Sequence, residues 1–321
     1  MGSLPMRLVC LLLCCLLLTG CAQNVVQEDR YQDALPDIDP EAGVAKDREV
    51  TLYYRLADEP ALVPVVQTIS VRSSEYAEFA VLRKLLEGPP SLSQGLQSAI
   101  PEGTRLVSAY RDGSILYVTL SREFIDNAGQ QNDQEERQVA RRLSVYAVVN
   151  SLCGIPNASF STVQIRVDLN GTGEGVGVSP SLLGFSDVGV GTQWLEPMGF
   201  EQSVVVTPQL TAELLLAHLA ADEHAAAYPL FAESETGGLQ KPDYATVETQ
   251  MKTLGTIDDF TIRSAQEEEN GRSAEVRADI AWTPRGEAQR TVENVSIQML
   301  REGEIYKMGY RSLLSALQAE G

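Results

Sequence analysis

The chain has 321 residues, which is enough for about two domains with buried cores. Its formal net charge is −19, from 25 basic and 44 acidic residues, and the basic residues form no clustered face in the sequence. This excludes the class of nucleic-acid-binding proteins and disfavours electrostatic adhesion to anionic lipid headgroups.

The first element is an apolar run from Leu8 to Leu18, which follows the basic residue Arg7. The run is shorter than the about 20 residues of a transmembrane helix, and it has the length and basic flank of a secretory signal peptide. No later segment offers about 20 consecutive apolar residues. We therefore expect residues 1–20 to be a signal peptide and the rest of the chain to lie outside the cytoplasmic membrane.

The leader ends in Leu18-Thr19-Gly20-Cys21, a string that resembles the lipobox of bacterial lipoproteins. The resemblance implies cleavage between Gly20 and Cys21 and attachment of a diacylglyceryl group to the Cys21 thiol. Two acyl chains, for example palmitate, anchor a protein stably, whereas one chain does so only marginally. The alternative is an ordinary signal peptide in which Cys21 is incidental. The lipoprotein hypothesis places the chain at the outer face of the cytoplasmic membrane.

A polar segment follows the lipobox. It is rich in Gln, Asp, Glu and Pro and has little apolar periodicity, so it cannot bury enough surface to become ordered. We expect residues 21–48 to be a flexible tether between the anchor and the folded body.

We expect a first globular domain over residues 49–190. The pattern predicts strands over 50–56 and 63–71, a helix capped by Ser73 or Ser74 and ended by Gly88-Pro89-Pro90, a hairpin around Asp112-Gly113, a helix over about 134–152 and a strand over 162–169. The apolar face of the helix over 134–152 includes Val139, Leu143, Tyr146, Val149 and Leu152. This order of elements predicts an α+β layer with helices on one face of a sheet.

Five segments of this region occur in the order found in a known family. They are Leu85-Leu86-Glu87-Gly88-Pro89, Ile100-Pro101-Glu102-Gly103-Thr104, Val118-Thr119-Leu120-Ser121 with Phe124, Tyr146-Ala147-Val148-Val149-Asn150-Ser151-Leu152, and Val163-Gln164-Ile165-Arg166-Val167-Asp168. With them, residues 49–185 resemble the GerMN domain of sporulation and germination lipoproteins. The family often has Gly directly after the last Asp, whereas Leu169-Asn170 intervene here. The resemblance implies a fold similar to ring-building domains, and envelope assembly or binding rather than catalysis.

We expect a second α+β domain over residues 200–321, after a Gly-containing junction. The pattern predicts a helix capped by Thr211 that continues toward Phe231, a helix over 244–254, strands over 257–266, 273–282, 292–301 and 305–310, and a terminal helix over 312–319. Helices followed by a curved antiparallel sheet resemble the cystatin-like or NTF2-like group, whose members often enclose a pocket.

The sequence predicts no catalytic, cofactor-binding or metal-binding residues. His218 and His224 are six residues apart and do not share a helix face, so we expect two helical surface positions. The run from Gly171 to Gly177 lacks the Lys-Ser/Thr pair of a phosphate-binding loop, which favours a flexible loop. Cys153 follows apolar helical residues and is interpreted as a buried structural thiol.

The leading hypothesis is a non-enzymatic lipoprotein, anchored through Cys21, that contributes protein contacts to envelope assembly in sporulation or germination. Its expected partners are envelope or sporulation proteins, with self-association among these contacts, and no nucleic acid. The alternative is a ligand-binding or sensor-modulating lipoprotein whose C-terminal domain holds a wall fragment or small molecule. A third hypothesis, a hydrolase acting on peptidoglycan fragments, has no supporting motif in the sequence.

Overall fold

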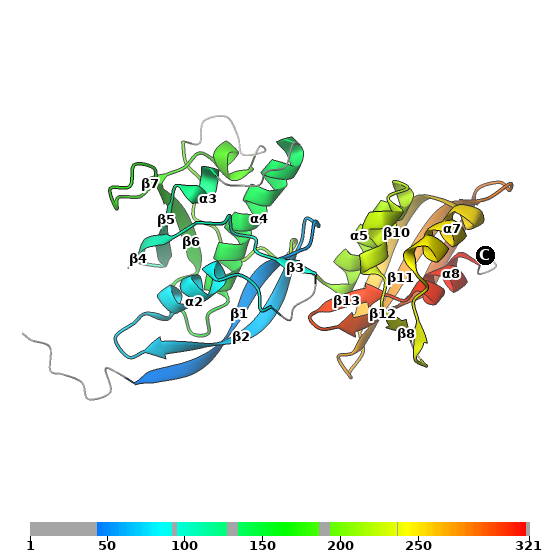
Figure 1. Cartoon of the computed structure of the whole chain (residues 1–321), viewed down its shortest axis with the longest axis horizontal. Coiled ribbons are helices and arrows are strands. Elements are labelled where there is room, and N and C mark those ends of the chain that lie inside the picture. The colour runs from blue at the N-terminus through cyan, green and yellow to red at the C-terminus, as the bar shows by residue number, and fades with distance from the viewer. Residues whose placement is uncertain (1–43, 92–94, 127–133, 186–192, 236, 319–321) are drawn as a thin grey trace, which may run out of the picture. The chain divides into compact units, whose positions relative to one another are not determined.

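The computed structural model describes residues 44–91, 95–126, 134–185, 193–235 and 237–318. The predicted signal peptide, including Gly20, and Cys21 with most of the predicted tether lie outside the described residues. Residues 44–206 are named here the N-terminal region and residues 207–318 the C-terminal region (Figure 1). None of the described helices is both long and apolar enough to span a membrane.

A three-stranded sheet with the order β2-β1-β3 opens the N-terminal region. Its strands are β1 (Ala45–Leu56), β2 (Leu62–Arg72) and β3 (Leu96–Gln97). The predicted strands over 50–56 and 63–71 are therefore confirmed, but β1 begins at Ala45, so the last residues of the predicted tether belong to this strand. Toward the end of β2, buried and exposed side chains alternate, because one face of the strand packs on the core and the other faces solvent.

Helix α2 (Ala77–Leu86) follows β2 and ends where the sequence predicts. Its C-cap is Glu87, and the next residue, Gly88, has a φ of +86°, a conformation that favours glycine. The predicted cap at Ser73 or Ser74 is wrong, because the N-cap residue is Tyr76 and its side chain makes no capping hydrogen bond. Burial of the apolar face of α2 stabilises this helix in place of a cap.

A four-stranded sheet with the order β4-β5-β6-β7 forms the rest of the N-terminal region. Its strands are β4 (Leu106–Asp112), β5 (Ile115–Ser121), β6 (Thr162–Asp168) and β7 (Val176–Gly177). The antiparallel pair β4 and β5 is the predicted hairpin, whereas β5 and β6 are parallel. Parallel neighbours need a crossover connection, which here contains helices α3 (Glu123–Asp126) and α4 (Gln134–Cys153).

The second half of α4 is buried on nearly every side. The predicted apolar residues Leu143, Val149 and Leu152 are buried, and so are residues that the predicted face did not include: Ser144, Val145, Ala147, Val148, Asn150 and Ser151. The helix packs against α2, β6 and the 3-10 helix η2 (Pro180–Leu183). Its buried polar side chains must therefore find hydrogen-bond partners inside the protein.

The first helix of the C-terminal region, α5 (Pro208–Ala220), begins earlier than predicted. The predicted cap Thr211 is wrong: the N-cap is Thr207, whose Oγ1 accepts the N–H of Leu210 at 3.1 Å. Thr211 lies inside the helix and is fully buried. Proline at the first helical position needs no N–H partner, which accounts for the start at Pro208.

The predicted continuation of this helix toward Phe231 is also wrong. Helix α5 ends at Ala220, and Asp222 then has a φ of +62°, which interrupts the helical path. A short helix α6 (His224–Ala227) and a 3-10 helix η3 (Tyr228–Leu230) follow.

The rest of the C-terminal region follows the predicted order, except for a small hairpin before the second predicted helix that the sequence did not predict. Its elements are a small hairpin of β8 (Ser234–Glu235) and β9 (Leu239–Gln240), helix α7 (Tyr244–Leu254), strands β10 (Gly255–Glu267), β11 (Ser273–Pro284), β12 (Arg290–Glu302) and β13 (Ile305–Met308), and helix α8 (Tyr310–Leu317). The three long strands β10 to β12 and the short strand β13 form an antiparallel sheet in chain order. Register shifts between β10 and β11 are of the kind that bends a sheet.

One face of this sheet is filled by helices α5 and α8, which contact its strands. Along β11, the alternate residues Val276, Ala278 and Ile280 are fully buried on that side. The α+β class is therefore confirmed for the chain. The likeness of the C-terminal region to cystatin-like or NTF2-like folds stays a prediction.

Candidate functional site

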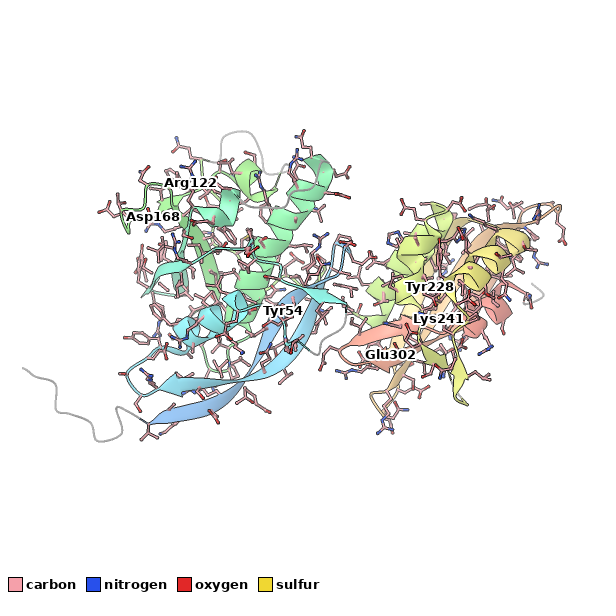
Figure 2. All side chains as sticks on the ribbon, in the orientation of Figure 1. Tyr54, Arg122, Asp168, Tyr228, Lys241 and Glu302 are labelled. Carbon is pink, nitrogen blue, oxygen red and sulfur yellow. The ribbon has the colours of Figure 1, made fainter. Side chains whose placement is uncertain are left out.

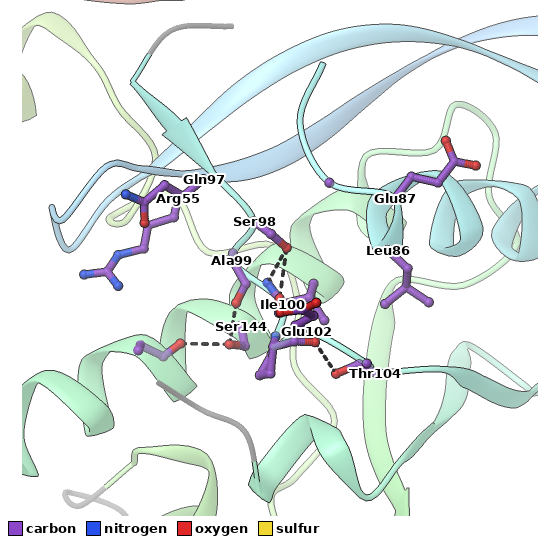
Figure 3. Close-up of a pocket in the computed structure, with 14 residues that line it drawn as sticks. Arg55, Leu86, Glu87, Gln97, Ser98, Ala99, Ile100, Glu102, Thr104 and Ser144 are labelled. Atoms are coloured by element: carbon purple, nitrogen blue, oxygen red, sulfur yellow. Dashed lines mark hydrogen bonds between the residues drawn. The ribbon is translucent and has the colours of Figure 1, made fainter. Parts of the chain in front are cut away.

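A cavity of about 530 Å³ lies in the N-terminal region, between the end of α2, the segment 97–104 and the middle of α4 (Figure 3). Two of the five family-like segments contribute to its wall, through Leu86-Glu87-Gly88 and the whole of Ile100–Thr104. The cavity is large enough for a small ligand or for a few side chains of a partner. It is therefore the first candidate site of the described residues.

The hydroxyl groups that line this cavity are all engaged with nearby backbone (Figure 3). The Ser144 Oγ donates to the carbonyl of Ala99 at 2.6 Å, and the Thr104 Oγ1 donates to that of Pro101 at 2.7 Å. The Ser98 Oγ lies 2.9 Å from the carbonyl of Ile100. No histidine or cysteine is among the described residues that line the cavity, so no lining hydroxyl has an adjacent imidazole base.

Arg55 is the one cation among the described lining residues, and its charged group is already held. Its Nε donates to the carbonyl of Glu59 at 3.1 Å and its Nη2 to that of Asp58 at 2.9 Å. Burial lowers the pKa of Arg55, although neighbouring carboxylates oppose that shift. In Figure 3 the guanidinium points away from Ser98 and Ser144. The arrangement is suited to binding by shape and backbone groups rather than to proton transfer.

Serine side chains in two other family-like segments also hold separate parts of the backbone together. In the α4 segment, the Ser151 Oγ accepts the N–H of Tyr53 at 3.1 Å, which ties the helix to β1. In the β5 segment, the Ser121 Oγ accepts the N–H of Arg105 at 2.9 Å. These polar residues have structural roles, because each satisfies a backbone group that would otherwise lie buried or part-buried without a partner.

Asp168, at the end of β6, organises the glycine-containing loop that follows it (Figure 2). Its carboxylate accepts the N–H groups of Gly173 at 2.9 Å, Thr172 at 3.1 Å and Asn170 at 3.3 Å. These bonds, the one from Gly173 first, hold the pKa of Asp168 below its ordinary value. The loop amides thus surround the protein's own carboxylate and not a phosphate, and the interpretation of this run as a phosphate-binding loop is not supported.

The second candidate site is the face of the β4-β5-β6-β7 sheet opposite the buried side chains of β5 and β6. Tyr110, Tyr117 and Gln164 lie opposite one another on three neighbouring strands. The two tyrosine rings are stacked, with centroids 4.8 Å apart and planes 6° apart, and Tyr110 is 47% exposed. Their alternation with buried residues such as Leu116 and Val118 puts them on the outer side of the sheet.

Two further side chains complete this surface. The Arg166 Nη1 donates to the Tyr110 hydroxyl at 2.8 Å, and its Nη2 donates to the carbonyl of Gly175. Trp194 is 49% exposed and packs directly on Gly177, where any β-carbon would lie 2.8 Å from that of Trp194. We name Tyr110, Tyr117, Gln164, Arg166 and Trp194 the aromatic face. Tyr, Trp and Arg are the side chains enriched at the energetic centres of protein interfaces.

The residues singled out in the sequence are not brought together. His224 is only 8% exposed, so its predicted surface position is wrong; its Nε2 lies 2.8 Å from the Asp222 Oδ1, without hydrogen-bond alignment. His218 is part-buried, with its Nδ1 2.8 Å from the Glu223 Oε2. Cys153 is half-buried rather than buried, and partial burial raises the pKa of its thiol. Among the residues that the structure describes, no group of three or more His, Cys, Asp and Glu side chains could hold a metal ion.

The aromatic face is the feature that the sequence interpretation missed. One partial signal was present: Tyr110 and Tyr117 lie on the two strands of the predicted hairpin. Their pairing depends on a turn at residues 113 and 114, one position after the predicted Asp112-Gly113. Arg166 and Trp194 carried no such signal, because only the tertiary structure brings the segment after residue 192 onto this sheet.

Comparison with known protein families gives a match within the N-terminal region. Residues 51–170 match the protein family Germane, described as sporulation and spore germination. No curated protein sequence matches the chain. The GerMN-like interpretation of this region is therefore supported, and the match links residues 51–170 to sporulation or spore germination.

Solved structures similar to this chain include GerMN domains of the sporulation protein GerM from Bacillus subtilis. Its tandem GerMN domains are 17% identical, with a TM-score of 0.30, over 48% of this chain and 45% of that one. Its first GerMN domain is 21% identical, with a TM-score of 0.27, over 38% of this chain and 83% of that one. The chain thus matches less than half the length of the tandem structure.

Proposed function

We propose that this chain is a non-enzymatic lipoprotein, anchored at the outer face of the cytoplasmic membrane through Cys21, whose N-terminal region binds envelope proteins during sporulation or germination. The observation that carries this proposal is the aromatic face. It combines two half-exposed aromatic residues, Tyr110 and Trp194, with an arginine held in a fixed position. Rigid aromatic side chains lose little entropy on binding, which is why they serve as anchors in protein interfaces.

The polar residues of the family-like segments form hydrogen bonds within the fold, and this supports a binding role for other residues. Ser144, Ser151 and Asp168 all hold backbone groups of their own chain. Their side chains are therefore committed to the fold, which leaves exposed side chains of other segments to meet a partner.

A crosslinking pull-down from sporulating cells tests the binding proposal. The double variant Tyr110→Ala with Trp194→Ala should lose the envelope proteins that the native chain recovers. Leu239→Ala is the control, because Leu239 is 51% exposed but lies on the β8–β9 hairpin of the C-terminal region. Recovery of the same proteins by the double variant, or of none by the native chain, would overturn the proposal.

The anchor is tested separately. Cys21→Ala should release the chain from membranes, because the acidic body offers no electrostatic affinity for anionic lipid. Retention of this variant on membranes after a high-salt wash would show that Cys21 is not the anchor, as the hypothesis of an ordinary signal peptide holds.

The cavity supports a second candidate function, the binding of a small ligand such as a wall fragment. It lies in the N-terminal region; a shallower hollow of about 480 Å³ lies between α5 and β10 in the C-terminal region, where the sequence led us to expect a pocket. A muropeptide digest should raise the melting temperature of the native chain but not that of Ala140→Phe, which fills the cavity from α4. No shift in the native chain would count against this candidate.

A further inference from the structure

Strand β2 forms one edge of the β2-β1-β3 sheet. Among the described residues, only the first residue of β2 makes backbone hydrogen bonds on the outer side of this edge. The Leu62 N–H donates to the Val204 carbonyl at 2.7 Å, and the Leu62 carbonyl accepts the Val206 N–H at 2.8 Å. Peptide groups alternate in direction along a strand, so those of Pro64, Val66, Thr68, Ser70 and Arg72 point outward as well. Beyond Leu62, no backbone bond to this side exists among the residues that the structure describes.

The composition of this edge is unusual for an unpaired strand. The devices with which proteins normally protect a free edge, proline and charge, stand only at its two ends, as Pro64 and Arg72, and Val65–Val71 between them contains neither. Val66 is 60% exposed on its outer face, whereas Val65 and Ile69 are buried on the core face. A β-branched, uncharged edge segment of this length readily accepts another strand.

A second copy of this chain is the partner that the edge fits best. Two chains of net charge −19 repel each other over most of their surfaces, and a neutral strand is where they can approach at the lowest electrostatic cost. Like strands also pair about a two-fold axis, which gives a closed dimer and no open fibre.

We propose that two copies of this chain pair antiparallel through β2, with the two-fold axis at Thr68. Thr68 then lies opposite its own copy, and Val66 opposite Ser70. Pro64 lies opposite Arg72, where its missing N–H removes only one bond of the pair. This register pairs every outward-facing residue from Pro64 to Arg72 and stops before Leu62, whose outer side is already bonded. Registers centred on Gln67 or Ile69 pair fewer of them.

The pairing extends the core as well as the ladder. On the inner face the same register places Val65 opposite Val71, both of which are buried in one copy. The two three-stranded sheets become one continuous sheet. The inference shares with the proposed function only the idea of protein contacts, since the β2 edge and the aromatic face are different surfaces.

Site-directed disulfides test the register in the processed, lipidated chain, which has lost residues 1–20 and carries its lipid on Cys21, with Cys153→Ala as the parent. In this register the two Thr68 Cα atoms lie about 5.5 Å apart, within the range of a disulfide. The two Ser70 Cα atoms lie about 14 Å or more apart, because four residues separate Ser70 from its counterpart along the strand. Mild oxidation should therefore crosslink Thr68→Cys but not Ser70→Cys, while Val66→Cys mixed with Ser70→Cys should form the hetero-disulfide.

Sedimentation of the uncrosslinked full chain in mild detergent gives an independent readout. Val66→Pro removes an outward N–H that makes no bond within one copy, and should weaken the dimer about tenfold or more by the loss of two hydrogen bonds per pair. A monomeric native chain, a dimer unaffected by Val66→Pro, or equal crosslinking of Thr68→Cys and Ser70→Cys would overturn the proposal. The Tyr110 and Trp194 double variant should still dimerise, so failure of partner binding and failure of dimerisation are separate results.

Discussion

The side chain of Asn150 on α4 holds both backbone groups of Glu201. Its Oδ1 accepts the Glu201 N–H at 2.8 Å, and its Nδ2 donates to the Glu201 carbonyl at 2.9 Å. Asn150 itself is fully buried. A side-chain amide can replace a strand neighbour in this way, and it fixes the segment after residue 192 against α4, 51 positions away in the chain.

Asn150→Ala should lower the free energy of unfolding by about 1–3 kcal/mol, because it leaves the Glu201 backbone groups without partners. Asn150→Asp should also be destabilising, since a carboxylate cannot donate to the Glu201 carbonyl. Chemical denaturation measures both, and hydrogen exchange should quicken first over residues 193–206. Gln209→Ala, which removes only an exposed helical pair with Glu213, is the control and should cost little. Equal stability of Asn150→Ala and Gln209→Ala would contradict this role.

Asp168 should make the loop after β6 sensitive to acid. The backbone bonds hold its pKa in the folded chain below that in the unfolded chain, so their stabilisation is fully present above about pH 4 to 5 and is lost as the pH falls through the folded pKa. Asp168→Asn should flatten this dependence, because an amide does not change charge. Hydrogen exchange of residues 170–175, followed between pH 6 and 3, checks it; an identical pH profile in the variant would show that another group is responsible.

Gly255 should tolerate no side chain. It ends α7 with a φ of +145°, and a β-carbon there would lie 2.7 Å from the Cα of Pro284, in addition to meeting the carbonyl of Thr283. Gly286 also has a positive φ, of +82°, but open space around it. Gly286→Ala should therefore cost only the backbone strain of about 1–2 kcal/mol, and Gly255→Ala distinctly more. Thermal unfolding of the two variants separates the effect of the close contact at Gly255 from that of backbone strain. Equal losses of stability would mean that the contact with Pro284 relaxes freely.

Lys241 should be needed for the stability of the C-terminal region. Its side chain is 1% exposed, and its Nζ donates to the carbonyls of Phe231 at 3.1 Å and Tyr228 at 3.2 Å and to the Glu233 carboxylate at 2.8 Å (Figure 2). Lys241→Met keeps the stem but leaves these acceptors unpaired, so it should cost about 3 kcal/mol in denaturation experiments.

The matched control for this variant is Lys252→Met, at a lysine that is 52% exposed and pairs with Glu248 one helical turn away. We expect little change from it, because exposed ion pairs contribute little to stability. A small effect of both variants would mean that water replaces the Lys241 contacts.

Local patterns were enough to predict the elements whose ends are set by nearby residues. The hairpin about Asp112-Gly113 and helix α7, which ends before Gly255, lie where the sequence places them. The predicted cap at Thr211 failed because a second hydroxyl residue, Thr207, stands near the helix start and the path of the chain selects it. The predicted caps at Ser73 and Ser74 failed because α2 begins after Tyr76 with no side-chain cap. The predicted buried face of α4 was incomplete for a related reason. A helix that is packed from several sides needs no single apolar stripe.

By itself, the sequence determined the α+β class and the GerMN-like order of segments, because periodicity, turn residues and short motifs are local properties of the chain. It also supplied the lipobox hypothesis, which concerns residues outside those that the structure describes. Only the tertiary structure decided what the polar motif residues do, and which side chains remain exposed. Asn150 and Glu201 meet, and Trp194 joins Tyr110 on one sheet face, through contacts between distant segments that no local pattern encodes.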